Sequence, residues 1–505
     1  MATQIKNGDF AMMGQEPGRQ PKIFYPHMNL EQRVPRTHVL RRIQERIDFS
    51  FIYAEVRDTY GGNGNVSIPP PVILKMMLLL VLYNVRSERE LMETIPMRLD
   101  WLWFLGYDID SEVPDHSVLS KARVRWGVEA FRRFFERVVW QCVEAGLVVG
   151  SKIFVDSSLM DADASNNSVI DTRSLKVQLQ EGYKKLEARL EERSEGTRRY
   201  VKENRRYISR TDPDAGIVNR GKPKLSYQVH RAVDGRGEVI TATETTPGDV
   251  NEAHEMIPLL ESHHLNTGVK ADTVVADSKY GTVENFLACC DQGVEAHMPD
   301  LKESTAKRIE KLNIFSEERF EYDGESDTYR CPAGQRLKPK SLHMSRQSRD
   351  YAAPKKICGA CELREQCTRN KSGRTVKRHL RQEELDGMRE ASRSAKAKRD
   401  IKMRQHLMER SYARGTRYGY DRARWRGLWR VQIQEYLVSA VQNIQVLLRY
   451  GSYLKRSPSV MMEEIKGTVT RSIRSFSEFN ELMNSKIGRM VLSDPNYPRL
   501  SFIET

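Results

Sequence analysis

The sequence has few cysteines and no long apolar run. Seven cysteines among 505 residues, with nothing that suggests secretion, lead us to expect no disulfide framework. The first fifteen residues lack a basic segment followed by an apolar core, so they do not have the pattern of a secretory signal peptide. The most apolar stretch, residues 72–85, is too short to span a bilayer and contains Lys75. We therefore expect an intracellular protein with no membrane partner, and we interpret 72–85 as a buried helix.

Acidic residues are fewer than basic ones, and one segment has almost none. The chain has 82 Lys and Arg against 68 Asp and Glu, which gives a net charge of +14 and a pI near 9.3. This balance favours a polyanionic partner such as nucleic acid, although charge that serves only solubility is the alternative. Between residues 402 and 430, nine Lys and Arg are opposed only by Glu409 and Asp421. We interpret this segment as an electrostatic footprint for phosphate.

The first part of the chain is expected to be helical. The length predicts two to four domains, and residues 22–150 have a helical pattern. Pro69-Pro70-Pro71 suits the first turn of a helix over 72–85, and Ser87 is a suitable cap for the next helix. A further stretch starts at Pro114 and runs past Trp126. Its basic residues are candidates for phosphate contact, although many helical domains bind nothing: Lys121, Arg123, Arg125, Arg132 and Arg133.

From residue 152 the pattern changes to strands. Strands are predicted at 153–160 and 273–277, and a hairpin joins 225–232 to 238–245. Between them, residues 174–207 are dense in charge at helical spacing, which is typical of a solvated helical insertion. Apolar positions across 431–448 predict a helix that packs on the sheet. This alternation of strands and helices predicts an α/β fold.

Three acidic residues stand in positions that suit metal-dependent chemistry. Asp156 closes the apolar run 152–155, Asp277 closes 273–276, and Glu409 lies on a helical stretch rich in arginine. Each alone has an ordinary interpretation, as a turn cap for the aspartates or a salt-bridged surface residue for the glutamate. Together, two strand ends and a helical Glu suit a pair of Mg²⁺ ions for in-line phosphoryl transfer. Rival acids lie nearby, in less favourable positions: Asp161, Asp163 and Asp272.

The cysteines divide into two groups. Cys331, Cys358, Cys361 and Cys367 include a CxxC pair and have the ligand count of a closed tetrahedral Zn²⁺ site. The alternative is four free thiols in a loosely packed insertion. The remaining three lie on apolar helix faces and are interpreted as core residues: Cys142, Cys289 and Cys290.

Several short motifs, in this order along residues 25–450, resemble the DDE transposases of bacterial insertion sequences with an InsH-like N-terminal domain. In the helical part they are Ser87-x-Arg89-Glu90-Leu91 and Pro114-Asp115-His116-Ser117. Further along they are Val155-Asp156-Ser157-Ser158, Thr211-Asp212-Pro213-Asp214-Ala215, Tyr227-Gln228-Val229-His230, Ala276-Asp277-Ser278-Lys279-Tyr280-Gly281, and Arg404-x4-Glu409-x2-Tyr412 followed by Arg426-Gly427-Leu428. A cysteine pattern like that of 331–367 also occurs in the insertion of this family.

The resemblance implies a ribonuclease H-like catalytic domain with Asp156, Asp277 and Glu409 as the ligands of Mg²⁺ or Mn²⁺. It also implies an all-helical N-terminal domain and a zinc-ribbon-like insertion whose four cysteines bind Zn²⁺. The family often has a Lys seven residues after the Glu, where this chain has Thr416. The residues expected to contact DNA are Arg404, Arg410, Arg414, Arg417 and Arg426.

We therefore expect a transposase that binds the ends of a DNA element, cleaves them and joins 3′ ends to target DNA. It is expected to act as a homodimer or larger assembly in the cytoplasm, with the nucleoid. Two alternatives remain: a nuclease without strand transfer, and a non-catalytic DNA-binding protein derived from a transposase. The expected boundaries are 1–150 for the helical DNA-binding domain, 151–302 and 401–450 for the catalytic domain, 303–400 for the insertion and 451–505 for a tail.

Overall fold

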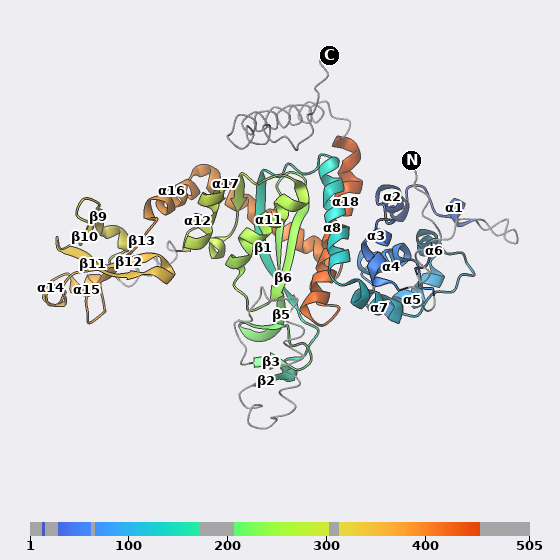
Figure 1. Cartoon of the computed structure of the whole chain (residues 1–505), viewed down its shortest axis with the longest axis horizontal. Coiled ribbons are helices and arrows are strands. Elements are labelled where there is room, and N and C mark those ends of the chain that lie inside the picture. The colour runs from blue at the N-terminus through green and yellow to red at the C-terminus, as the bar shows by residue number, and fades with distance from the viewer. Residues whose placement is uncertain (1–12, 16–28, 62–65, 172–206, 302–312, 455–505) are drawn as a thin grey trace, which may run out of the picture.

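The computed structural model describes residues 13–15, 29–61, 66–171, 207–301 and 313–454, with a helical part, a central sheet and a second sheet side by side (Figure 1). The helical insertion predicted over 174–207 falls almost wholly outside these ranges, as does most of the tail after residue 450. No helix in the described ranges is long and apolar enough to cross a membrane.

The first part of the chain is helical, as predicted. Its longest apolar helix, α4, begins with Pro70 and Pro71, and every residue in it but Leu82 is buried. Ser87 caps α5, since its side chain accepts a hydrogen bond from the backbone N–H of Glu90 at 3.1 Å. The helices are α1 (Leu30–Arg33), α2 (Val39–Arg46), α3 (Ile52–Val56), α4 (Pro70–Leu82), α5 (Glu88–Thr94), α6 (Leu99–Leu105), α7 (Ser117–Trp126) and α8 (Glu129–Glu144).

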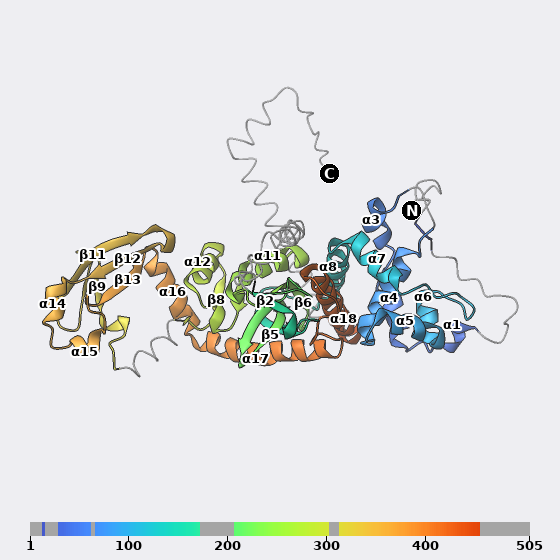
Figure 2. The ribbon, with the colours of Figure 1, turned by 90° about the horizontal axis from the view of Figure 1, so that it is seen from below.

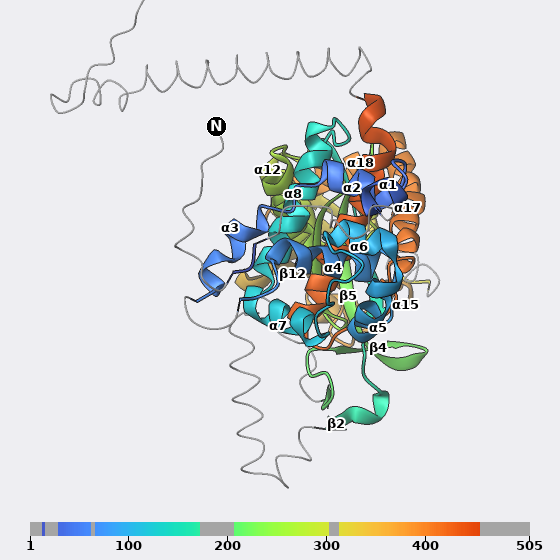
Figure 3. The same ribbon diagram turned by 90° about the vertical axis from the view of Figure 1, so that its right-hand side faces the viewer.

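The helical stretch after Pro114 is two helices, where the sequence predicted one. Gly127 has φ +68°, a left-handed backbone conformation that ends α7 and turns the chain before α8 begins. The amphipathic α8 then packs beside α18 (Leu428–Leu454), so helices from opposite ends of the chain lie side by side (Figure 3).

The central sheet contains both parallel and antiparallel strands. The order is β4-β5-β1-β7-β8, and β6 pairs with the other half of the edge of β5. β1 runs parallel to β7 and antiparallel to β5, while β5 and β6 form the predicted hairpin. The strands are β1 (Lys152–Asp161), β4 (Gly216–Arg220), β5 (Lys222–Asp234), β6 (Ile240–Pro247), β7 (Thr273–Val275) and β8 (Glu295–His297); a separate short pair is β2 (Val169–Asp171) with β3 (Tyr207–Ser209).

Helices cover both faces of this sheet (Figure 2). The side chains of β1 alternate: Ile153 and Val155 pack under α11 (Met256–Thr267) and α12 (Val283–Gln292), while Phe154 joins the core on the opposite face. That opposite face is covered by α17 (Ala395–Thr416) and α18. Its core continues without a break into the helical N-terminal part.

A buried ion pair connects α18 to the sheet. The Arg231 guanidinium of β5 lies 2.7 Å from the Glu435 carboxylate, and both side chains are fully buried. The rings of Tyr412 and Tyr420 lie against the guanidinium, each with its centroid 4.8 Å away. Ser439 donates a further hydrogen bond to Glu435 at 2.7 Å. This polar group is satisfied on several sides, as a buried charge pair requires.

The region of the four cysteines is a second sheet with its own small core. Its strand order is β13-β12-β11-β10-β9, and all neighbouring strands are antiparallel. Phe320, Tyr329, Leu337, Tyr351 and Val376 form its core. The strands are β9 (Glu321–Asp323), β10 (Thr328–Arg330), β11 (Arg336–His343), β12 (Ser348–Ala352) and β13 (Thr375–His379), with short helices α14 (Lys355–Gly359) and α15 (Arg364–Cys367); α16 (Gln382–Ser392) leads back to α17.

Candidate active site

Asp156 lies in the middle of β1, which matches the strand predicted at 153–160, so only the interpretation of Asp156 as a strand end is wrong. β1 continues to Asp161 because β5 pairs with it along its whole second half. Burial, with smaller contributions from the charges of Asp277 and Glu252, raises the pKa of Asp156 to about 6, although Arg404 and the backbone N–H of Ser157 act in the opposite direction. The carboxyl group is therefore held among other carboxylates in a partly desolvated position.

Asp277 lies next to Asp156 across two parallel strands. Phe154 of β1 is paired directly with Val275 of β7, and each aspartate follows its member of that pair by two residues. Asp277 caps the short 3₁₀ helix Ser278–Tyr280, since its Oδ1 accepts a hydrogen bond from the Lys279 N–H at 2.8 Å. Asp277 therefore caps a turn, as the alternative interpretation predicted, and it also lies close to Asp156.

Within the part of the chain that the structure describes, Glu409 forms no hydrogen bond or ion pair with Asp156 or Asp277. It is exposed on α17, and its carboxylate accepts a hydrogen bond from Gln405 at 3.2 Å. The same helix is nevertheless tied to the site, because the Tyr412 hydroxyl donates to the carbonyl oxygen of Asp156 at 2.9 Å. Tyr412 lies one turn after Glu409, so the two side chains are neighbours on the helix surface.

A fourth acidic residue, Glu252, lies at this site and was not predicted. It is 6% exposed, and its carboxylate accepts hydrogen bonds from Ser157 and Gln228 and pairs with Lys279. The sequence offers only a helix-start signal here: Asn251 caps the 3₁₀ helix Glu252–Glu255, and an acid in the first turn of a helix is ordinary. Nothing in the local sequence distinguishes it from such a residue.

Two of the three rival acids pair with basic side chains. Asp161 pairs with Lys224 at 3.2 Å. Asp163 pairs with Arg422 at 3.0 Å and with Arg426 at 3.2 Å. Asp272 precedes β7 at the end remote from Asp277.

Most of the arginines predicted to contact DNA form ion pairs within the chain. Arg404 pairs with Asp156, and its side chain is only 13% exposed. Arg410 and Arg414 both pair with Glu238. Arg426 is held by Asp163, and Arg417 is exposed at the end of α17. The pairing of Arg404 makes it part of the acidic site itself.

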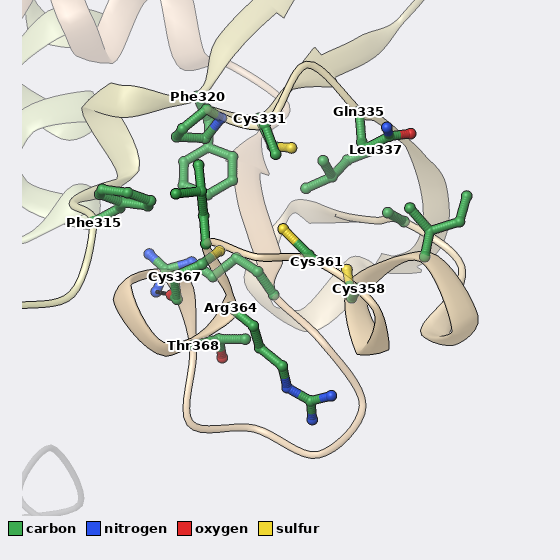
Figure 4. Close-up of a pocket in the computed structure, with 16 residues that line it drawn as sticks. Phe315, Phe320, Cys331, Gln335, Leu337, Cys358, Cys361, Arg364, Cys367 and Thr368 are labelled. Carbon is green, nitrogen blue, oxygen red and sulfur yellow. Dashed lines mark hydrogen bonds between the residues drawn. The ribbon is translucent and has the colours of Figure 1, made fainter.

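The four cysteines predicted to bind zinc line one small pocket of about 40 Å³ (Figure 4). Burial raises the pKa of the Cys367 thiol, and the other three cysteines are close enough to raise it further. A Cβ atom on Gly373 would lie 3.0 Å from the Cys358 sulfur, so a side chain there would press on the thiol. The donor type fits Zn²⁺. Throughout the ranges that the structure describes, however, no three His, Cys, Asp or Glu side chains are arranged to hold a metal ion, in this pocket or around Asp156.

Two family models match the chain. Residues 28–125 match a transposase domain (DUF772), and residues 330–448 match a transposase DDE domain. The chain belongs to the insertion-sequence DDE transposases. The second match includes Glu409 and the four cysteines but begins after Asp277, so it covers the last part of this transposase's site. No curated protein matches the transposase. As a DDE transposase, it is an enzyme that cleaves and transfers DNA, and the family implies the use of a divalent metal ion.

Proposed function

We propose that the catalytic domain of this transposase has a ribonuclease H-like fold, made of residues 151–302 and 401–450. The strand order β6-β5-β1-β7-β8, in which only β5 runs antiparallel to the other strands, supports this assignment. Residues 1–150 are then the helical DNA-binding domain and 451–505 a tail. Residues 303–400 form the insertion, in which we propose that Cys331, Cys358, Cys361 and Cys367 hold Zn²⁺.

Asp156, Asp277 and Glu409 are the proposed ligands of two Mg²⁺ ions. The observation that carries this proposal is the placement of Asp156 on β1 and of Asp277 just after the parallel neighbour β7, each two residues beyond the paired Phe154 and Val275. Their carboxylates are the hard oxygen ligands that Mg²⁺ or Mn²⁺ takes. When bound, such ions activate the attacking hydroxyl and stabilise the charge on the leaving oxygen.

The remaining residues of the site orient these groups. Arg404 holds the Asp156 carboxylate, and the Tyr412 hydroxyl holds the backbone of the same residue against α17. This second bond keeps the helix that carries Glu409 next to the strand that carries Asp156. The basic side chains of Arg410, Arg414 and Arg417 would attract the phosphate backbone of the DNA end.

We further propose that the enzyme binds the ends of its element, cleaves a phosphodiester bond at each and joins the 3′ ends to target DNA. Two ends must be paired for this reaction, so a homodimer or larger assembly on DNA is expected. The reaction belongs in the cytoplasm, where the nucleoid provides both the element and the target.

The test uses DNA that carries the sequences flanking the gene, with Mg²⁺ and Asp156→Asn, Asp277→Asn or Glu409→Gln. The unchanged chain should give cleavage at discrete ends and joined products, and each substitution should abolish both. Glu261→Gln, at an exposed position on α11, is the matched control and should remain active. Cleavage without joining would identify a nuclease, and binding without cleavage even in Mn²⁺ would identify a DNA-binding protein.

A further inference from the structure

A groove of about 700 Å³ lies between the helical N-terminal part and the beginning of α18. One wall is α7, and the other is the segment that enters α18, which Figure 1 shows beside each other. These walls are about 300 residues apart in sequence. The groove is lined by Ser120, Lys121, Arg123, Val124, Arg125, Arg424, Trp425, Arg426 and Arg430.

The lining is unusually one-sided in charge. Six of the nine lining residues are Lys or Arg, and none is acidic. Among the described residues, no carboxylate forms an ion pair with Lys121, Arg125, Arg424 or Arg430. Cations concentrated in a concave surface attract a polyanion more strongly than the same cations spread over a convex one.

Arg123 and Trp425 form the floor that keeps the walls together. The Arg123 guanidinium lies 4.0 Å from the centre of the Trp425 ring and pairs with Glu88. The Trp425 N–H also donates to Glu88, at 3.2 Å. Arg123 is only 4% exposed, so its role is to hold the walls, while Lys121 and Arg125 are exposed and available for a ligand.

We propose that this groove binds the phosphate backbone of double-helical DNA, independently of base sequence. The proposal rests on the proposed function, because it says where the transposase holds its DNA. Phosphates carry the regularly spaced negative charge that Lys and Arg side chains neutralise with release of counterions. The groove uses residues of both the helical part and the catalytic part, so one DNA segment contacts both.

The ion pairs in the structure distinguish Lys121 and Arg125 of the groove from other basic residues of the helical part. Arg132 and Arg133 on α8 also fitted the pattern of phosphate contacts in the sequence. Each is paired with Glu129 and Glu136 on its own helix. They are therefore the matched control for a change at Lys121 and Arg125, because both pairs remove two positive charges from the helical part.

The experiment measures binding of the full-length protein to a short labelled duplex of arbitrary sequence, in EDTA, over a series of salt concentrations. Lys121→Gln with Arg125→Gln should weaken binding and make the slope of log K against log[salt] shallower by about 1.8, since each lost phosphate contact contributes about 0.9. Arg132→Gln with Arg133→Gln should leave both quantities unchanged. EDTA prevents cleavage, so the result does not depend on whether the protein cuts or joins DNA.

Three results would overturn the proposal. They are unchanged binding in the groove variant, an equal loss in the control variant, and tighter binding of a single-stranded RNA of the same length than of the duplex. The charge-conserving pair Lys121→Arg with Arg125→Lys distinguishes a folding defect from lost charge. It should bind with the original salt slope, and a shallower slope here would also contradict the proposal.

Discussion

The carboxylate of Glu252 connects the two segments that carry the aspartates. It accepts a hydrogen bond from Ser157, which follows Asp156, and pairs with Lys279, which lies two residues after Asp277. Because Glu252 is buried, it is well placed to keep the spacing between these segments constant. Its contacts make it a positioning residue, since each reaches an aspartate through a neighbour.

Glu252→Gln should therefore lower the cleavage rate and the affinity for Mg²⁺ by about 10- to 100-fold, as is usual for residues that orient metal ligands. The protein should remain folded, because an amide of the same shape still accepts hydrogen bonds. Single-turnover cleavage over a range of Mg²⁺ concentrations measures both effects, with Glu261→Gln as the control. A rate and a Mg²⁺ dependence equal to those of the unchanged chain would show that Glu252 is not needed.

The affinity for Mg²⁺ should fall as the pH drops below about 6. The pKa of Asp156 is raised to about 6 in the folded protein, and a proton on this carboxyl group competes with the metal ion. The raised pKa also means that the metal-free native state binds more protons than the unfolded chain between about pH 4 and 6. The stability contributed by this group therefore falls as the pH rises through that window.

Titration calorimetry with Mg²⁺ at several pH values tests this prediction. Binding should strengthen steeply from pH 5 to 7 and then level off, and Asp156→Asn should remove the pH dependence along with most of the affinity. Binding that is equally strong at pH 5 and 7 would contradict it.

For individual residues, the sequence predicted the two candidate aspartates but not the side chains that contact them. A short apolar run that ends in an acid is a local pattern, so the sequence could offer Asp156 and Asp277 as candidates, and the structure brings them close together. Glu252 and the ion pairs of Arg404 and Arg410 depend on which segments meet in space, and no local pattern encodes that. The strand predicted at 153–160 is confirmed, but Asp156 ends only its apolar run, because pairing with β5 continues the strand through Ser157 and Ser158.

The helix α18 carries Glu435, a carboxylate that is fully buried and paired with Arg231 of the central sheet. Glu435 is its buried partner for Arg231, and the hydroxyl of Thr243 on β6 donates a further bond to Glu435 at 3.0 Å. Removing only one member of such a pair leaves the other charge buried and unpaired, which costs far more than the net value of the pair.

Glu435→Gln should lower the free energy of unfolding by about 3–5 kcal/mol. Arg231→Met combined with Glu435→Leu should recover much of this loss, because no buried charge remains. Urea unfolding followed by circular dichroism measures both variants. If the single substitution and the double substitution cost the same, the charge itself is not the source of the destabilisation.

The elements themselves were predicted unevenly. A continuous apolar run identified α4, which is buried on almost all sides, and apolar positions at helical spacing identified α18. The hairpin of β5 and β6 was identified from two strand-like segments close together in the sequence. The break at Gly127 was missed, since a single glycine in a helical pattern does not by itself end a helix. The sheet of β9–β13 was missed as well, because its short strands are charged and mostly exposed.

The molecule has a large hydrophobic core and a separate, much smaller one. One core runs from the N-terminal helices through one face of the central sheet to α18, while the sheet with the four cysteines has a separate core. The sequence suggested boundaries near residues 150, 302 and 400, but the continuity of the first core could not be predicted. It follows from the packing of α2, α4 and α8 against α18, which is about 300 or more residues later in the sequence.

Calorimetry should therefore show separate unfolding of the cysteine-containing sheet. If Zn²⁺ is bound there, a strong chelator or Cys361→Ser should lower that transition by several degrees and leave the main transition in place, since metal binding contributes directly to folding. Cys142→Ser, in the main core, is the control and should affect only the main transition. Absence of zinc from the purified protein by elemental analysis would contradict the metal assignment.

The packing of α2, α4 and α8 against α18 also determines when these helices can complete their fold during synthesis. The Arg42 side chain bonds to the carbonyl oxygen of Leu448, 406 residues later in the chain. At about 5–20 residues per second, a ribosome needs roughly 20–80 seconds to add that length. From the time each is made until α18 is added, the surfaces of α2, α4 and α8 that α18 covers remain exposed on the nascent chain. We therefore expect the growing polypeptide to need protection of these surfaces, for example by chaperones, until α18 has been made.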